Sequence, residues 1–141
     1  MPEDGNPGKY GSRRRVLLAD DHPLVLDRVA TLLQKDFDIV GVAHNGLEMV
    51  DQAMRLRPDI IVADVSMPEL DGIQAAHRLR QMGTAALVVF LTIHESAEFL
   101  AACQAEGALG FVLKTQMKSD LITAINAALA GQTFVSHHRR D

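Results

Sequence analysis

Residues 60–72 read IIVADVSMPELDG, and the order of residues in this segment predicts the repeating unit of the fold. Four apolar residues, typical of a short strand buried on both faces, run directly into Asp64. A turn containing Pro68 and the pair Asp71–Gly72 follows. Apolar residues at helical spacing come next, at Ile73, Ala76, Leu79 and Met82. The stretch therefore predicts a strand that ends in a carboxylate, a turn and an amphipathic helix.

The same unit recurs along the rest of the chain. Further apolar strands are predicted over 16–19, 39–43, 87–91 and 110–113. Each precedes a helical pattern, and these helices are expected to end near Lys35, Pro58, Gly107 and Gly131, with Ser119 as the cap of the last one. Five strands that alternate with five helices require crossover connections, so we predict an α/β fold with a parallel sheet covered on both faces. An eight-unit barrel needs about 250 residues, which leaves an open doubly wound sheet.

Length and composition bound the remaining possibilities. The 141 residues, 48% hydrophobic and 23% charged, suit one globular domain. We assign residues 14–131 to it, residues 1–13 to a disordered tail, and residues 132–141 to a C-terminal tail or the start of an interdomain linker. No apolar stretch is long enough to span a bilayer and no signal peptide is evident, so a cytoplasmic location without membrane contact is expected. A net charge of −4 argues against nucleic-acid binding by this chain alone, and the lone Cys103 is expected to be a core side chain.

Polar side chains stand where four of the predicted strands end. They are Asp20 and Asp21 after the first strand, Asp64 after the third, Thr92 after the fourth and Lys114 after the fifth. Because ligands bind at the carboxyl ends of parallel strands, these groups should converge at one edge. Clustered carboxylates repel unless a cation joins them, and an all-oxygen ligand set selects Mg²⁺ or, alternatively, Mn²⁺. A metal, a lysine and a hydroxyl around a central carboxylate predict phosphoryl transfer, with Asp64 as the acceptor.

Four segments resemble a known family. Residues 17–24 (LLADDHPL), 60–72, Leu91–Thr92 and 110–114 (GFVLK) are similar to the response-regulator receiver domains of bacterial two-component systems, and the resemblance covers about residues 14–135. The run Asp20–Asp21–His22–Pro23, and a lysine followed by Thr115 instead of proline, resemble the NarL/LuxR-type subgroup. The resemblance implies a flavodoxin-like (CheY-like) sheet with five strands in the order 2-1-3-4-5.

Roles for individual residues follow from the resemblance. It implies that Asp64 is phosphorylated, and that Asp20, Asp21, Asp64 and the backbone carbonyl of Ser66 hold Mg²⁺. Thr92 and Lys114 would contact phosphoryl oxygens, Thr92 and Phe111 would form the conformational switch, and Ser66 and His94 would tune hydrolysis. The histidines His22 and His94 are otherwise expected at the solvated rim of the site, His44 and His77 at the surface, and His137 and His138 in a polar tail.

The resemblance also implies partners and an output. A sensor histidine kinase would donate the phosphoryl group, two phosphorylated copies could pair, and the domain would be no enzyme beyond slow reaction with small phosphodonors and slow hydrolysis of its own acyl phosphate. DNA would be bound only through a C-terminal helix-turn-helix domain absent from this chain. A stand-alone receiver that acts through protein contacts or a phosphorelay is the alternative.

Two rival functions fit less well. A haloacid-dehalogenase-like, Mg²⁺-dependent phosphatase would require a second aspartate two residues after the nucleophile, where this chain has Ser66. A flavin-binding module would require a phosphate loop rich in Ser, Thr and Gly after the first strand. Asp20 and Asp21 would repel a phosphate there.

Overall fold

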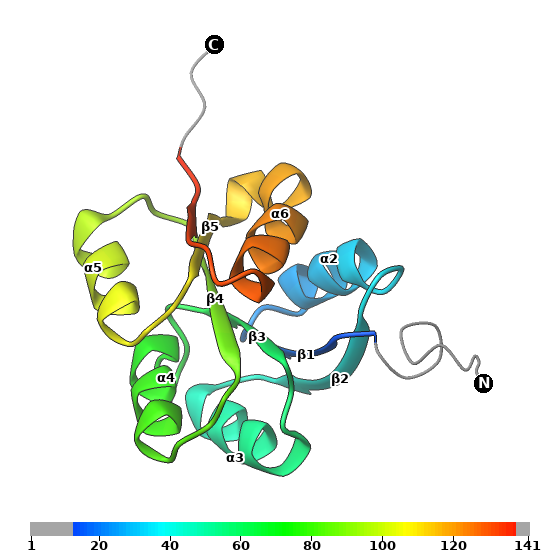
Figure 1. Cartoon of the computed structure of the whole chain (residues 1–141). Helices are drawn as coiled ribbons and strands as arrows, with labels where there is room; N and C mark the ends of the chain where they lie inside the picture. The colour runs from blue at the N-terminus through cyan, green and yellow to red at the C-terminus, as the bar shows by residue number, and fades with distance from the viewer. Residues whose placement is uncertain (1–12, 138–141) are drawn as a thin grey trace.

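The computed structural model of the chain describes residues 13–137. Its centre is a parallel sheet in the order β2-β1-β3-β4-β5-β6 (Figure 1). The strands are β1 (Arg15–Ala19), β2 (Asp38–Ala43), β3 (Ile60–Asp64), β4 (Leu87–Thr92), β5 (Gly110–Leu113) and β6 (Phe134–Val135). The helices are α2 (Pro23–Leu33), α3 (Gly46–Leu56), α4 (Gly72–Gln81), α5 (Ala97–Ala105) and α6 (Met117–Leu129), and a short 3-10 helix, η1 (Lys114–Gln116), precedes the last.

The helices cover the sheet in two layers, α2 and α6 on one face and α3, α4 and α5 on the other (Figure 1). Each layer has its own apolar cluster. Phe90, Leu17 and Ile61 point into the cluster under α3, α4 and α5, whereas Leu18 and Val62 point into the cluster under α2 and α6. Neighbouring residues of one strand thus enter opposite layers, which is why the strands read as continuous apolar runs. The predicted α/β class, doubly wound sheet and 2-1-3-4-5 order are confirmed.

The helix starts follow local capping chemistry. Asn45 and Ser96 accept a hydrogen bond from the backbone N–H three residues later, and Asp71 forms a reciprocal capping box with Gln74. The prediction that Ser119 caps the last helix is wrong. The chain leaves β5 directly into η1, so α6 already begins at Met117 and Ser119 lies within its first turn.

The structure adds one strand to the five that were predicted. Phe134 and Val135 pair in parallel with β5, and the N–H of Phe134 donates to the carbonyl of Leu109 over 2.8 Å. Two residues are too few to show a strand period, so pairing with the exposed edge of β5 could not be read from the pattern. Of the two expected tails, residues 1–12 and 138–141 lie outside the described part of the chain, His138 included.

Candidate functional site

The strand register brings the polar strand ends together. Ala19 of β1 pairs with Ala63 of β3, so Asp20 and Asp64 leave adjacent strands at the same level. On the other side, Asp64 pairs with Leu91, one residue before Thr92. Thr92 in turn pairs with Leu113, one residue before Lys114. Four neighbouring strands therefore deliver their polar groups to one edge of the sheet.

Lys114 bridges the two buried carboxylates. Its Nζ lies 2.8 Å from Oδ2 of Asp20 and 3.4 Å from Oδ2 of Asp64. Asp20 is 1% exposed and Asp64 4% exposed. Asp21, by contrast, is exposed at the rim. The ammonium thus partly neutralises two charges that would otherwise repel each other inside the protein.

The electrostatics of Asp64 show that this neutralisation is incomplete. Burial, and secondarily the charge of Asp20, raises the pKa of Asp64 from 3.8 to about 6. Lys114 and the N–H of Ser66, which donates to Oδ1 of Asp64 over 3.4 Å, act in the opposite direction. Asp64 is therefore mostly ionised at neutral pH but strongly disposed to gain a positive partner.

The acidic edge has the donor set of a hard-metal site. Asp20, Asp21, His22 and Asp64 each place one ligand atom within 4.8 Å of the others. Oδ2 of Asp20 is buried and receives no hydrogen bond from the described residues, although the Lys114 ammonium lies beside it. A buried carboxylate oxygen in this state, next to two further carboxylates, suits a divalent cation with oxygen ligands. The role of the Ser66 carbonyl as a ligand stays a prediction.

His22 lies closer to this cluster than the sequence analysis expected. Its Nδ1 is 3.0 Å from Oδ1 of Asp20 and 3.2 Å from Oδ1 of Asp21, and its backbone N–H also donates to Oδ1 of Asp20. The ring itself remains exposed, as a rim residue should be. The signal available in the sequence was the uninterrupted run Asp20–Asp21–His22 ahead of the helix-starting Pro23.

The proposed switch residues lie on the two strands beyond Asp64. Thr92 is buried, and its Oγ1 accepts the backbone N–H of His94 over 3.2 Å. The side chain of His94 is exposed near this loop. Phe111 of β5 is paired with Phe90 of β4 and is buried in the cluster under α5. Thr92 and His94 thus lie at the strand end that carries the site, whereas Phe111 lies in the core three residues before Lys114 on β5. The switching and tuning roles of these residues stay predictions.

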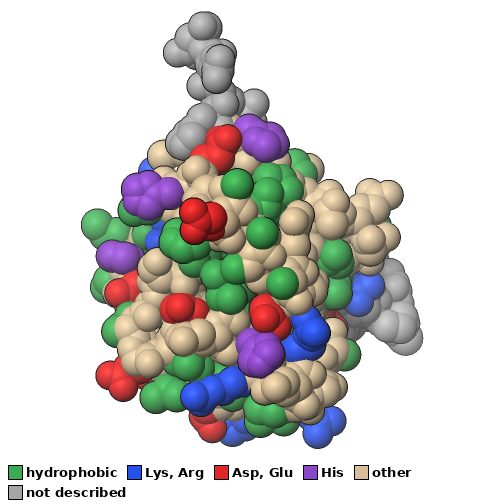
Figure 2. Space-filling view, turned by 90° about the vertical axis from the view of Figure 1, so that its left-hand side faces the viewer, with side chains coloured by type: hydrophobic (Ala, Val, Ile, Leu, Met, Phe, Trp, Pro, Cys, Tyr) green, Lys and Arg blue, Asp and Glu red, His purple; other side chains and the backbone are tan. Residues whose placement is uncertain are grey.

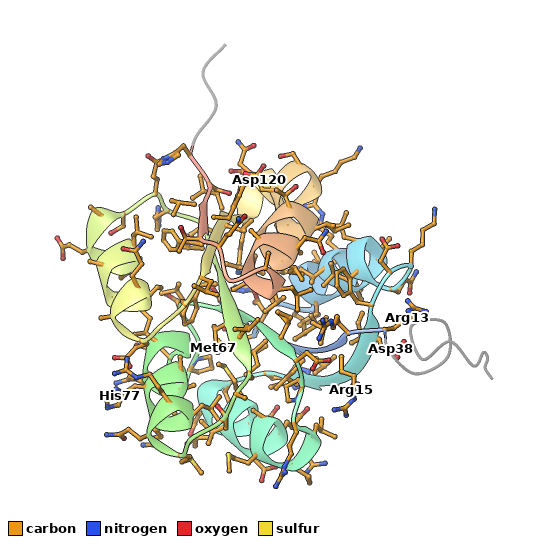
Figure 3. The ribbon with its side chains drawn as sticks, in the orientation of Figure 1. Arg13, Arg15, Asp38, Met67, His77 and Asp120 are labelled. Carbon is orange, nitrogen blue, oxygen red and sulfur yellow. The ribbon has the colours of Figure 1, made fainter. Side chains whose placement is uncertain are left out.

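The loop after Asp64 depends on a close approach that only glycine permits. The N–H of Gly72 donates to the carbonyl of Val65 over 3.0 Å, which draws the start of α4 under the site. A Cβ on Gly72 would lie 2.1 Å from the carbonyl oxygen of Asp64, well inside contact distance. Met67 of this loop, labelled in Figure 3, is buried in the cluster under α3, α4 and α5. Gly72 is therefore a positioning residue, a role that its place in a predicted turn did not indicate.

Features outside the site agree with simple structural roles. Cys103 is buried, and burial raises the pKa of its thiol to about 12, so it is a core side chain as expected. His44 and His77 lie at the surface, each beside a glutamate. Figure 2 shows the face that carries α4 and α5, where acidic, basic and apolar side chains are mixed without a continuous basic patch. Over residues 13–137, no helix combines the length and hydropathy that a membrane span requires.

Comparison with known proteins identifies the family. Residues 16–126 match the family described as the response regulator receiver domain. A putative transcriptional regulator of Pseudomonas aeruginosa is 38% identical over 118 residues, which cover 83% of this chain and 57% of the relative. The nitrate/nitrite response regulator NarL of Escherichia coli K12 is 32% identical over 123 residues, covering 86% of this chain and 57% of NarL.

A solved receiver-domain structure has the same fold as this chain. The isolated receiver domain of RcsB from Salmonella enterica serovar Typhimurium, determined in the presence of the phosphomimetic BeF3−, superposes with a TM-score of 0.80 at 25% identity and covers 89% of this chain and 94% of that one. The chain spans less than three fifths of the two curated relatives named above. Nothing in these similarities supports the phosphatase alternative. The chain belongs to the response regulator receiver domains, and its relatives are of the NarL/LuxR type.

Proposed function

We propose that this domain is a phosphorylation switch in which Asp64 accepts a phosphoryl group from the phosphohistidine of a sensor kinase. The observation that carries the proposal is the bridge of Lys114 between Asp20 and Asp64 at the carboxyl edge of the sheet. An Asp64 oxygen forms the new O–P bond while the N–P bond of the phosphohistidine breaks. The departing imidazole keeps the electron pair of that bond and takes a proton from solvent.

Each neighbour of Asp64 has a distinct task in this reaction. Lys114 neutralises negative charge on the transferred group. The Thr92 hydroxyl donates to a phosphoryl oxygen after its hydrogen bond with the backbone N–H of His94 breaks. Asp20, Asp21, Asp64 and the Ser66 carbonyl are the proposed ligands of Mg²⁺, or of Mn²⁺ in its place. When bound, the cation neutralises charge on the phosphoryl oxygens. Ser66 and His94, each two residues after an active-site residue, are the residues to which we assign control of water access to the acyl phosphate.

A phosphorylation assay tests the acceptor. The chain is incubated with acetyl phosphate and Mg²⁺, and its intact mass is measured. We expect one added phosphoryl group, none in Asp64→Asn, and an unchanged yield in the control Asp51→Asn, since Asp51 is exposed on α3. Phosphorylation of Asp64→Asn at the normal level would show that the acceptor is wrong, and rapid turnover of added phosphoesters would show an enzyme rather than a switch.

The output is proposed for a longer protein. Because this chain corresponds to 57% of its relatives, we assign DNA binding to a C-terminal helix-turn-helix domain outside these residues. Phosphorylation would favour pairing of two receiver domains and thereby position the DNA-binding domains. Size-exclusion chromatography of the chain with and without acetyl phosphate tests the pairing, and an unchanged elution volume of the phosphorylated chain would argue against it.

A further inference from the structure

The C-terminal strand is bonded to the backbone of the residue proposed as the aromatic switch. In the β5–β6 pair, Phe111 lies opposite Val135, and the N–H of Ser136 donates to the carbonyl of Phe111 over 2.8 Å. The N–H of Phe134 donates to Leu109 on the same edge. The C-terminal segment is thus hydrogen-bonded to β5 itself rather than to a peripheral loop.

A buried side-chain contact holds this segment in place. Ser136 is 2% exposed, and its Oγ donates to Oδ2 of Asp120 over 2.6 Å. Oδ1 of the same carboxylate accepts the hydroxyl of Ser119 over 2.9 Å. Asp120 lies in the first turn of α6, and Figure 3 shows it beside the C-terminal segment. Hydrogen bonds to a carboxylate are stronger than neutral ones, and an acceptor that loses its donor while buried is costly, so this contact favours the docked segment.

Docking of the segment also covers the ring of Phe111. Phe111 is 3% exposed, and Val135 packs against the apolar cluster to which it belongs. Phe111, Phe134 and Val135 line one narrow crevice with Leu100 and Cys103 of α5. If β6 left the edge, this flank of Phe111 would face water. The docked strand and the buried ring therefore stabilise each other.

We propose that Phe134–Ser136 and Asp120 form a latch that opens and closes in step with the phosphorylation of Asp64, an inference that rests on the proposed function. A phosphoryl group on Asp64 draws the Thr92 hydroxyl away from the N–H of His94, which frees space on β4 beside Phe111. The ring then packs more firmly into the cluster under Val135. Phosphorylation and latch closure favour the same state, so the phosphoryl signal reaches the C-terminal segment, beyond which the proposed DNA-binding domain would lie.

Thermodynamic linkage makes the proposal quantitative. If occupation of the site raises the closed-to-open equilibrium constant of the latch by some factor, then the open latch must lower the affinity of the site for its ligand by the same factor. Couplings of this kind are typically about fivefold or more. The probe is beryllofluoride with Mg²⁺, whose loading is followed by ¹⁹F NMR, and the readout is hydrogen exchange of the Phe134 and Ser136 amides.

The test compares Ser136→Ala with the matched control Thr133→Ala, since Thr133 is exposed and its side chain makes no hydrogen bond within residues 13–137. In the unloaded wild type, both amides should be protected, and Ser136→Ala should lower their protection about tenfold, in line with the loss of a charge-assisted hydrogen bond. Loading should raise their protection about fivefold in the wild type. Ser136→Ala should lower beryllofluoride affinity, and Thr133→Ala should change neither quantity.

The outcomes separate the latch from the proposed function. Full loading of the wild type with unchanged or reduced protection of the two amides overturns the latch and leaves Asp64 as the acceptor. Equal beryllofluoride affinity in Ser136→Ala and Thr133→Ala also overturns it. Failure of the wild type to load at all, with no phosphorylation by acetyl phosphate, overturns the proposed function and the latch with it.

Discussion

Replacing Asp64 by Asn should stabilise the fold near neutral pH in the absence of divalent cations. Burial beside Asp20 raises the pKa of Asp64 from 3.8 to about 6 even with Lys114 in contact. Each unit of difference between the folded and unfolded pKa is worth about 1.4 kcal/mol, so ionised Asp64 costs the folded state about 3 kcal/mol. The amide of Asn has a similar shape and no charge to bury.

The sign of the pH dependence follows from the raised pKa. Well below the unfolded value of 3.8 the carboxyl is protonated in both states and imposes no cost. Between the unfolded value of 3.8 and the folded value of about 6, the folded state holds the proton more tightly, so stability falls as pH rises. Above about pH 7 the full cost applies. The advantage of Asp64→Asn should therefore grow from near zero at pH 4 to as much as about 3 kcal/mol at pH 7.5.

Urea denaturation between pH 4 and pH 8 in EDTA measures this difference. Asp51→Asn is the control, because Asp51 is exposed and its change should alter stability by about 0.5 kcal/mol or less at every pH. Added Mg²⁺ should stabilise the wild type more than Asp64→Asn and so narrow the gap. A variant no more stable than the wild type at pH 7.5, or a difference that does not depend on pH, would refute the electrostatic account of the site.

Three further predictions concern the site and its support. Lys114→Met should keep the circular dichroism spectrum of the wild type but slow phosphorylation by acetyl phosphate at least about tenfold, because Asp20 and Asp64 lose the ammonium that they share. The control Lys118→Met, on the exposed face of α6, should be phosphorylated at the wild-type rate. Gly72→Ala should lower the free energy of unfolding by about 2 kcal/mol or more in urea, since its Cβ meets the Asp64 carbonyl, whereas Gly83→Ala, strained only by its positive φ, should cost about 1 kcal/mol. Removal of Mg²⁺ with EDTA should abolish phosphorylation of the wild type, and restored activity with Mn²⁺ but not with K⁺ would identify a divalent requirement.

Most of the sheet could be predicted because its strands are buried on both faces. A run such as Ile60–Ala63 must be continuously apolar, and the next position is the first that meets the ligand edge. The polar residue that ends each run therefore marks the site. The starts of α3 and α4 are likewise marked by local residues, because Asn45 and Asp71 are of types that cap helix N-termini.

The start of α6 and the contacts of His22 were harder to predict from the sequence. The rule that Ser caps a helix applies only where the chain is otherwise extended, and here η1 already carries the backbone into helical geometry. His22 contacts two aspartates because of how the chain turns into α2, and residue type alone did not distinguish that geometry from an ordinary rim position.

The alternation of strands and helices, the edge at which the acidic residues gather and the candidate acceptor could all be inferred from the amino-acid sequence, because they depend on hydrophobic period and on strand ends. Three properties became visible in the folded chain alone: Phe134 and Val135 complete the sheet, Ser136 reaches the buried Asp120, and the pKa of Asp64 rises to about 6. Those properties depend on distances between segments far apart in the chain, and a local pattern carries no information about such distances.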